Sequence, residues 1–273
     1  MEPLVVTASE LDDHEWCPQY HEWRWRTKRR LSGPEPEWAV LGKWLHLQME
    51  SMIQGHPPSA QLTPPIPIAK GCALLAAVHA WWAKYGREHP WESVLVAEKS
   101  LSVDIGKLKS GRRVVFRGIP DAVVVWDGAL WHCSHKSLSG YSPVDVFCAG
   151  LARELHECLY PLLVRASWPG LPYGGTLANI VRKLAERRTN EDAAQALHIE
   201  FIPVDEADIE RARRDAIELC EVLDSKRRAR KSCTGKFGNS LCAYYGPCWR
   251  GIPIESALFE DANPLERYEG STS

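Results

Sequence analysis

The sequence lacks any long hydrophobic run and any excess of positive charge. No apolar stretch approaches the roughly 18 residues of a membrane-spanning helix. The stretch 1–13 is acidic and has no basic segment of the kind that opens a secretory signal, so we expect a cytoplasmic protein with no membrane partner. The net charge of −2 excludes a globally basic nucleic-acid-binding protein. Local basic stretches remain at 24–30, 182–188 and 226–231, and each could equally be a solvated helix face.

Cysteine is present without a disulfide pattern. The nine cysteines are odd in number and follow no export signal, which favours reduced thiols or metal ligands. The tight C-x2-C pairs of zinc knuckles are absent. Instead, Cys233, Cys242 and Cys248 lie close together near the C-terminal end, with glycines and aromatics between them. Thiolates in such a loop favour an iron–sulfur cluster or zinc, and three buried free thiols are the alternative.

The most informative stretch is 113–140, where short polar breaks separate three apolar, β-branched runs. We expect strands at 114–119, 122–126 and 129–133. Asp127-Gly128, between the last two, is a strong hairpin signal. A tight hairpin places the start of one strand beside the end of the next, so Asp121 and Lys136 are predicted to be neighbours.

A carboxylate beside an amine at a strand end suits metal-assisted phosphodiester cleavage. Asp121 would hold a hard divalent cation through oxygen. Such a cation polarises the phosphoryl oxygen and activates water. Lys136 would orient that water or stabilise transition-state charge. The alternative is an ordinary solvated hairpin tip.

Periodicity and capping signals predict the other elements. Expected helices cover 7–28, 37–53, 71–85, 145–165 and 205–228, and expected strands cover 94–104, 174–183 and 198–203. Loops are expected at 55–67 and 186–196. Helices that alternate with strands favour an α/β fold with a central mixed sheet flanked by helices. His46 and Glu50 are spaced to share one helical face.

Gly118-Ile119-Pro120-Asp121, the hairpin and then His135-Lys136-Ser137 resemble the core of the PD-(D/E)XK nuclease superfamily. The RecB-type branch, which includes phage exonucleases, is the most similar. The resemblance runs from about Ser9 to Cys248. It implies a restriction-endonuclease-like core in a single domain over 1–273. The implied parts are an N-terminal helical part at 1–90, a nuclease core at 91–204, and a C-terminal helix with a cysteine-rich loop at 205–250.

The same resemblance implies a set of site residues. The implied catalytic residues are Asp121, Lys136 and Glu98. The implied metal ligands are His46 and Asp121, with Ser134 at the acidic position of the motif and His135 through its backbone carbonyl. The implied DNA contacts are His156, Tyr160, Arg182 and Lys183, where the family has glutamine at the position of His156. The implied iron–sulfur ligands are Cys17, Cys233, Cys242 and Cys248.

The function that the resemblance implies is a Mg²⁺- or Mn²⁺-dependent DNA exonuclease or endonuclease of phage or bacterial recombination or repair. A 4Fe–4S cluster is the implied second cofactor, with zinc as the alternative. A helicase or recombination protein is a further candidate partner. Ser134 stands where the family has an acidic residue, so an inactive DNA-binding or partner-binding module on the same fold is the alternative. A third interpretation is an iron–sulfur structural subunit that needs a helicase.

Overall fold

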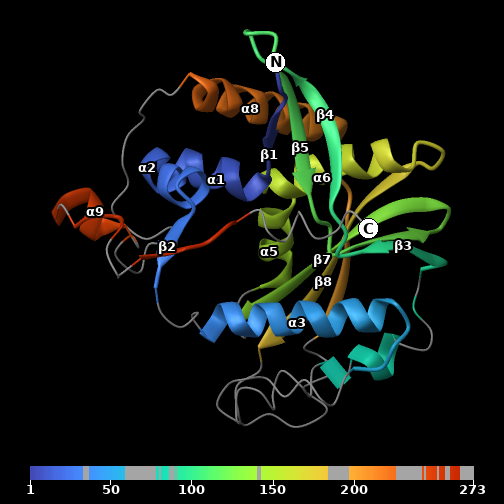
Figure 1. Cartoon of the computed structure of the whole chain (residues 1–273). Coiled ribbons are helices and arrows are strands. Elements are labelled where there is room, and N and C mark those ends of the chain that lie inside the picture. Colours follow the sequence, from blue (N-terminus) through green and yellow to red (C-terminus); the bar gives the residue numbers. More distant parts are fainter. Residues whose placement is uncertain are drawn as a thin grey trace. The chain divides into compact units, whose positions relative to one another are not determined.

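The computed structural model has an α/β fold in which mixed β-sheets are flanked by helices, as the sequence predicts (Figure 1). The structure describes residues 1–32, 37–58, 78–79, 81–85, 89, 91–139, 143–183, 197–225, 242, 244–250, 252–255 and 259–264. Two compact units are present. Unit 1 comprises 1–34, 102–118 and 210–273, and unit 2 comprises 35–101 and 119–209. Each unit is built from separated stretches, so their limits differ from the expected divisions at 90, 204 and 250.

Unit 2 contains a five-stranded sheet in the order β3-β6-β7-β8-β9. Its strands are β3 (Ser93–Ala97), β6 (Ala122–Trp126), β7 (Ala129–Ser139), β8 (Tyr173–Lys183) and β9 (Leu197–Ile202). The long strands β7 and β8 pair in parallel, and the other pairs are antiparallel. The predicted hairpin at Asp127-Gly128 is confirmed, with φ values of 50° and 67° that suit a tight two-residue turn. Strand β7 runs beyond its expected end at 133, because β8 continues to pair with it.

Helices cover both faces of this sheet. Helix α3 (Glu37–Ile53) has the expected bounds, and its Trp44, Leu45 and Met49 pack with Val124 and Cys133 on one face. The other face is covered by α5 (Val144–Leu151) and α6 (Leu155–Ser167). The prediction of one helix over 145–165 was wrong, because the chain turns at 152–154 and adopts an extended conformation at the residue before α6.

The prediction of one strand over 94–104 was also wrong. The chain leaves the sheet of unit 2 at Glu98, where φ is 46°, and resumes as β4 (Leu101–Lys107) in a separate three-stranded sheet. A non-glycine residue in this left-handed region ends a strand.

Unit 1 holds that three-stranded sheet, in the order β1-β5-β4, with β1 (Leu4–Val6) parallel to β5 (Arg113–Gly118). Its N-terminal helical region is not one helix as predicted but α1 (Ala8–Trp16), α2 (Pro18–His21) and the π-helix η1 (Glu22–Arg26). Pro18 disfavours helical geometry in the residue before it, and Cys17 is accordingly extended, with φ −159° and ψ 106°. The remaining elements are β2 (Arg29–Leu31), α8 (Glu206–Asp224), α9 (Tyr245–Arg250) and β10 (Phe259–Asp261); the start of α8, 206–209, belongs to unit 2.

Several expectations fall on residues outside this description. The expected helix at 71–85 is described only at 78–79 and 81–85, where it is helical. The expected loop at 186–196, most of the one at 55–67, and the basic stretch 226–231 lie outside the described residues. Within the described part of the chain, no helix is both long and apolar enough to cross a bilayer.

Candidate metal centre

Two carboxylates of unit 2 lie opposite each other at the edge of the five-stranded sheet. Glu98 directly follows β3 and Asp121 directly precedes β6, and the Glu98 amide donates to the Asp121 carbonyl across 3.1 Å. A β-bulge at Leu95 creates this alignment, since Val94 pairs with Val124 but Val96 pairs with Val123. Without the extra residue, Ala97 would stand opposite Asp121. Bulges commonly redirect side chains beside functional sites.

Helix α3 adds an imidazole to the two carboxylates. His46 Nδ1 lies 3.3 Å from Glu98 Oε1 and 3.3 Å from Asp121 Oδ1. One ligand atom from each of the three residues lies within 4.8 Å of the others, and within the described stretches no other trio of His, Cys, Asp and Glu side chains meets this criterion. We call His46, Glu98 and Asp121 the triad. The structure thus brings together Glu98, His46 and Asp121, which the sequence predicted as site residues. Glu50, which shares the helix of His46 and is half-buried, is not part of this group.

Electrostatics within the triad favour a shared proton when no cation is present. Burial lowers the pKa of His46, but the hydrogen bonds to Asp121 and Glu98 outweigh it and raise the pKa to about 10. Burial raises the pKa of Asp121, but the His46 hydrogen bond outweighs it and the pKa falls to about 2. A positive charge between two carboxylates is therefore stabilised here, as it would be for a metal ion.

His135 lies beside the triad with polar atoms that the described residues leave unsatisfied. Its backbone amide donates to Asp121 Oδ2 across 2.5 Å, and its ring is edge-on to the His46 ring at 5.9 Å. The side chain is buried, and neither ring nitrogen has a hydrogen-bond partner among the residues that the structure describes. Buried polar groups are nearly always paired, so the unsatisfied ring nitrogens point to a water, ion or ligand at this place.

The donor set suits a hard divalent cation. Two carboxylates and one imidazole offer oxygen and nitrogen ligands from three separate stretches of unit 2, with spacing that one ion could bridge. The second part of the expected motif lies one strand further on. Extending the β6–β7 register by one residue places Asp121 opposite Ser134, two residues before the predicted neighbour Lys136.

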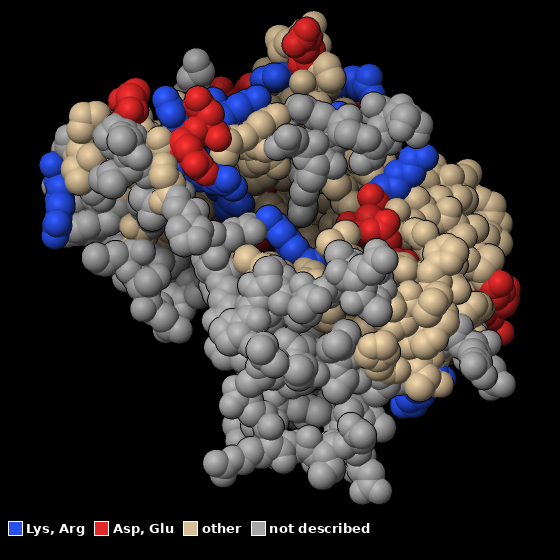
Figure 2. Space-filling view, turned by 60° about the horizontal axis from the view of Figure 1, so that its bottom comes forward, with Lys and Arg blue, Asp and Glu red and all other residues tan. Residues whose placement is uncertain are grey.

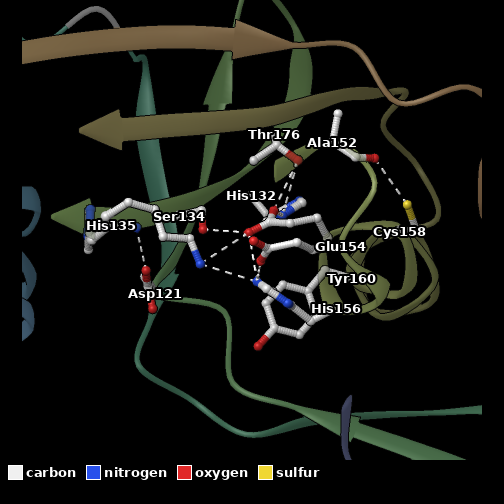
Figure 3. A network of polar contacts seen from close by, with 12 residues as sticks. Asp121, His132, Ser134, His135, Ala152, Glu154, His156, Cys158, Tyr160 and Thr176 are labelled. Atoms are coloured by element: carbon white, nitrogen blue, oxygen red, sulfur yellow. Dashed lines mark hydrogen bonds and ion pairs between the residues drawn. The ribbon is translucent and has the colours of Figure 1, made fainter. Parts of the chain in front are cut away.

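Strand alternation sends this segment to two faces of the sheet. Cys133, which packs against α3, shows that odd-numbered residues of this part of β7 face that helix. Ser134 and Lys136 therefore face α6. Lys136 Nζ lies 3.2 Å from His156 Nε2 and 3.6 Å from a carboxylate oxygen of Glu157 (Figure 3).

The hydroxyl of Ser134 belongs to the network on α6. It is buried and donates to Glu157 Oε1 across 2.6 Å (Figure 3). The structure thus places Ser134, expected at the metal, with Glu157 rather than in the triad. A serine hydroxyl that is committed to a carboxylate is a poorer metal ligand than a free one.

The two expected DNA contacts on α6 are used within the protein. His156 Nε2 contacts Glu157 Oε1 at 3.0 Å and Glu154 at 3.3 Å, in addition to Lys136. The Tyr160 hydroxyl donates to the carbonyl of Ile119 across 3.1 Å. Figure 3 shows both rings on the same side of the network. Their contact with DNA stays a prediction.

Arg182 and Lys183 end strand β8, where their backbones pair with Leu138 and Ser139 of β7. Their side chains lie outside the description, so their predicted contact with DNA is untested. On the face drawn in Figure 2, Lys and Arg alternate with Asp and Glu in small groups and do not form one continuous basic surface over the described residues. A DNA-binding surface there would have to be local.

The expected iron–sulfur ligands fall in unit 1. Cys17 is buried at the break between α1 and α2. Cys242 is buried in a cluster with Tyr244 and Phe259, and its sulfur accepts a hydrogen bond from the Tyr244 amide at 3.4 Å. Cys248 lies half-buried on α9, and Cys233 lies outside the described residues. Three of the four expected ligands therefore share one unit, and the cluster stays a prediction.

Sequence reasoning missed Glu157, which lies at the centre of the polar network. Its side chain is fully buried and receives contacts from β7, β8 and α6. Helical spacing puts Glu157 on the side of its helix opposite Leu155, Leu159 and Leu162, so the apolar pattern gave no signal for it. Its meeting with Ser134 depends on the break at 152–154, which no sequence pattern indicated.

Comparisons with known proteins give no family for this chain. No family model matches it, and no curated protein matches it. Among solved structures, the chain is similar to one titled "Crystal structure of SSO0001", with a TM-score of 0.43 and 11% identity. The likeness covers 93% of this chain and 89% of that chain. That title names no activity, ligand or partner.

Proposed function

We propose that this protein is a divalent-metal-dependent DNA nuclease on a restriction-endonuclease-like core, with Mg²⁺ or Mn²⁺ as its cofactor. The observation that carries the proposal is the convergence of His46, Glu98 and Asp121 within 4.8 Å, at the end of the hairpin whose second strand bears Lys136. The unsatisfied ring of His135 beside the triad supports it further.

The triad and Lys136 have different roles in the proposed reaction. The triad would hold the cation, which when bound supplies charge to polarise a phosphoryl oxygen and lower the pKa of water. Lys136 is partly exposed, with 27% of its side chain accessible, so its amine can reach a substrate while α6 holds it. It would orient the attacking water or stabilise the charge on the phosphate in the transition state.

DNA is the substrate that the resemblance to RecB-type nucleases suggests, and each of the three triad side chains is partly exposed. His156, Tyr160, Arg182 and Lys183 are the proposed contacts. We also propose that Cys17, Cys233, Cys242 and Cys248 hold a 4Fe–4S cluster, with zinc as the alternative. A helicase or recombination protein is the proposed partner.

The test is cleavage of end-labelled linear DNA with and without Mn²⁺. Asp121→Asn removes one anionic ligand but keeps an oxygen that can accept the His135 amide, so the fold should persist. We expect cleavage to fall at least about 100-fold. Asp127→Asn is the matched control, because it makes the same change at the exposed turn of the same hairpin, and it should cleave normally.

Two results would count against the proposal. Cleavage by Asp121→Asn equal to that of the native protein would remove the triad as the active site. Absence of cleavage in the native protein, with DNA binding retained, would favour the inactive module that Ser134 also permits.

A further inference from the structure

Glu157 is a carboxylate in an unusual position, because it is fully buried and contacted by five side chains. Its Oε2 lies 2.8 Å from His132 Nε2 and 3.3 Å from the Thr176 hydroxyl. Its Oε1 accepts from Ser134 at 2.6 Å and lies 3.0 Å from His156 Nε2. Oε1 also lies 3.6 Å from Lys136 Nζ. These contacts are drawn in Figure 3.

The position of Oε1 relates Glu157 to the motif on β7. Ser134 and Lys136 face the same side of the sheet, two residues apart, and Oε1 contacts both. A carboxylate borne by the strand at position 134 would lie within this same space. The helix therefore brings a negative charge to the place where the strand carries a neutral hydroxyl.

We infer that Glu157 is the positioning residue for Lys136, and that helix α6 supplies the carboxylate that strand β7 lacks at Ser134. The inference deepens the proposed nuclease function and rests on it for its catalytic meaning. Glu157 does not reach the substrate in this assignment, since its side chain is fully buried. It acts by fixing the amine of Lys136 directly through Oε1, the same oxygen to which His156 Nε2–H donates.

Stability alone does not account for this arrangement. Burying a carboxylate costs desolvation energy that its partners only partly offset, and apolar groups of similar volume often serve the fold as well. Burial raises the pKa of Glu157, but the hydrogen bonds from His132 and His156 outweigh it and hold the pKa well below its usual range. The network thus maintains an ionised group at a point that touches both Ser134 and the amine.

His132 extends the network away from the amine. Its Nδ1 lies 2.6 Å from the Tyr173 hydroxyl while its Nε2 faces Glu157. With the hydroxyl donating to Nδ1, the Nε2–H donates to the carboxylate. The orientation of Glu157 is therefore fixed from β7 and β8 independently of Lys136, as a positioning group requires.

The experiment moves the carboxylate between the two elements. Glu157→Gln keeps the shape and removes the charge, and we expect its Mn²⁺-dependent cleavage rate to fall at least about tenfold, in kcat rather than KM. The double variant Ser134→Asp with Glu157→Gln returns a carboxylate to the strand, and should recover most of that loss. Ser134→Asp alone crowds two buried carboxylates together, and should be less stable and less active than the native protein.

A second readout needs neither DNA nor metal. The rate at which an amine-reactive reagent modifies Lys136, followed by mass spectrometry at fixed pH, reports how the amine is held. Glu157→Gln should accelerate modification several-fold, because the carboxylate that holds the amine in place is gone and the amine is freer to meet the reagent. The double variant should return the rate toward the native value. Glu154→Gln is the matched control, since this half-exposed carboxylate contacts His156 on the same helix, and its rates should stay within about twofold of native.

The two readouts separate this inference from the proposed function. Unchanged labelling in Glu157→Gln, or no recovery in the double variant, would overturn the positioning role whatever the cleavage assay shows. The expected labelling pattern in a native protein that cleaves no DNA would instead overturn the nuclease and support the pairing of Glu157 with Lys136. Thermal melting checks that each variant folds. If Glu157→Gln does not fold, Glu157→Asp and the double variant replace it in the labelling assay. Labelling of Lys136 that stays partly slow in these variants would support the inference.

Discussion

His46 Nδ1 lies 3.3 Å from Asp121 Oδ1, so a helix and a strand that are distant in sequence meet at one carboxylate. The pKa of His46 is raised to about 10 by this contact and by Glu98, against the effect of burial. In the cation-free protein the imidazole is therefore protonated at neutral pH. A metal ligand must offer a lone pair, so binding at the triad has to displace that proton.

Mn²⁺ affinity should therefore rise with pH, by up to about tenfold per pH unit below pH 10. Calorimetry in buffers of different ionisation enthalpy should show about one proton released per ion bound. His46→Gln keeps both carboxylates and removes the titrating ligand. It should bind more weakly, with a flatter pH dependence. Tight binding to the native protein without proton release would show that the ion does not use His46.

Glu98 lies in a strained backbone conformation, and its replacement should separate stability from metal binding. Its φ of 46° costs a non-glycine residue about 1 kcal/mol. Glu98→Gly relieves that strain and removes a carboxylate crowded by Asp121. We expect an unchanged or higher free energy of unfolding in urea, and Mn²⁺ affinity at least about tenfold lower.

Lys28→Gly is the control for Glu98→Gly. Lys28 has a φ of 55° in unit 1, so the same relief of strain is available away from the triad. Its Mn²⁺ affinity should equal that of the native protein. A large loss of stability in Glu98→Gly alone would indicate that the Glu98 contacts support the fold rather than a metal ion.

Much of the triad could be predicted from the sequence because its signals are local. Asp127-Gly128 fixes the hairpin register, and that register places Asp121 opposite Ser134, two residues before Lys136. Helix α3 has the predicted bounds, so His46 falls on it as expected. The partner of Glu98 could not be predicted, since one bulged residue in β3 decides whether Glu98 or Ala97 stands opposite Asp121.

Other features depend on tertiary structure that no local pattern encodes. The turn at 152–154 interrupts a continuous apolar stripe, and it sets the face on which Glu157 meets Ser134. The break between α1 and α2 at Cys17 could be predicted from the sequence, because Pro18 restricts the backbone of the residue before it. The strand expected over 94–104 failed for a different reason: both halves are strands, but they join different sheets.

The buried His14 should make unit 1 sensitive to acid. Burial lowers the pKa of His14 to about 4, and its Nδ1 has no hydrogen-bond partner among the described residues. The unfolded chain takes up this proton near pH 6.5 and the folded chain only near pH 4. Protonation of His14 therefore leaves the free energy of unfolding unaffected above pH 6.5 and lowers it as the pH falls toward 4, by up to about 3 kcal/mol.

His14→Leu should remove that part of the pH dependence. Urea unfolding at several pH values between about 4 and 7 measures it as a smaller slope of unfolding free energy against pH. His79→Gln replaces an exposed histidine and should leave the slope as in the native protein. An equal slope in His14→Leu would show that His14 is protonated in the folded state without penalty.

The last prediction concerns Cys242, whose buried sulfur accepts the Tyr244 amide as the thiolates of metal clusters often do. Anaerobically purified protein should be brown, with broad absorbance near roughly 400 nm. Cys242→Ser should bleach it and lower the melting temperature, because cluster binding stabilises the folded state. Cys148→Ser, in unit 2, should keep the colour. One zinc per chain would make the site a structural zinc site. A native protein with neither iron nor zinc would show that Cys17, Cys242 and Cys248 bind no metal, and would remove the proposed cofactor.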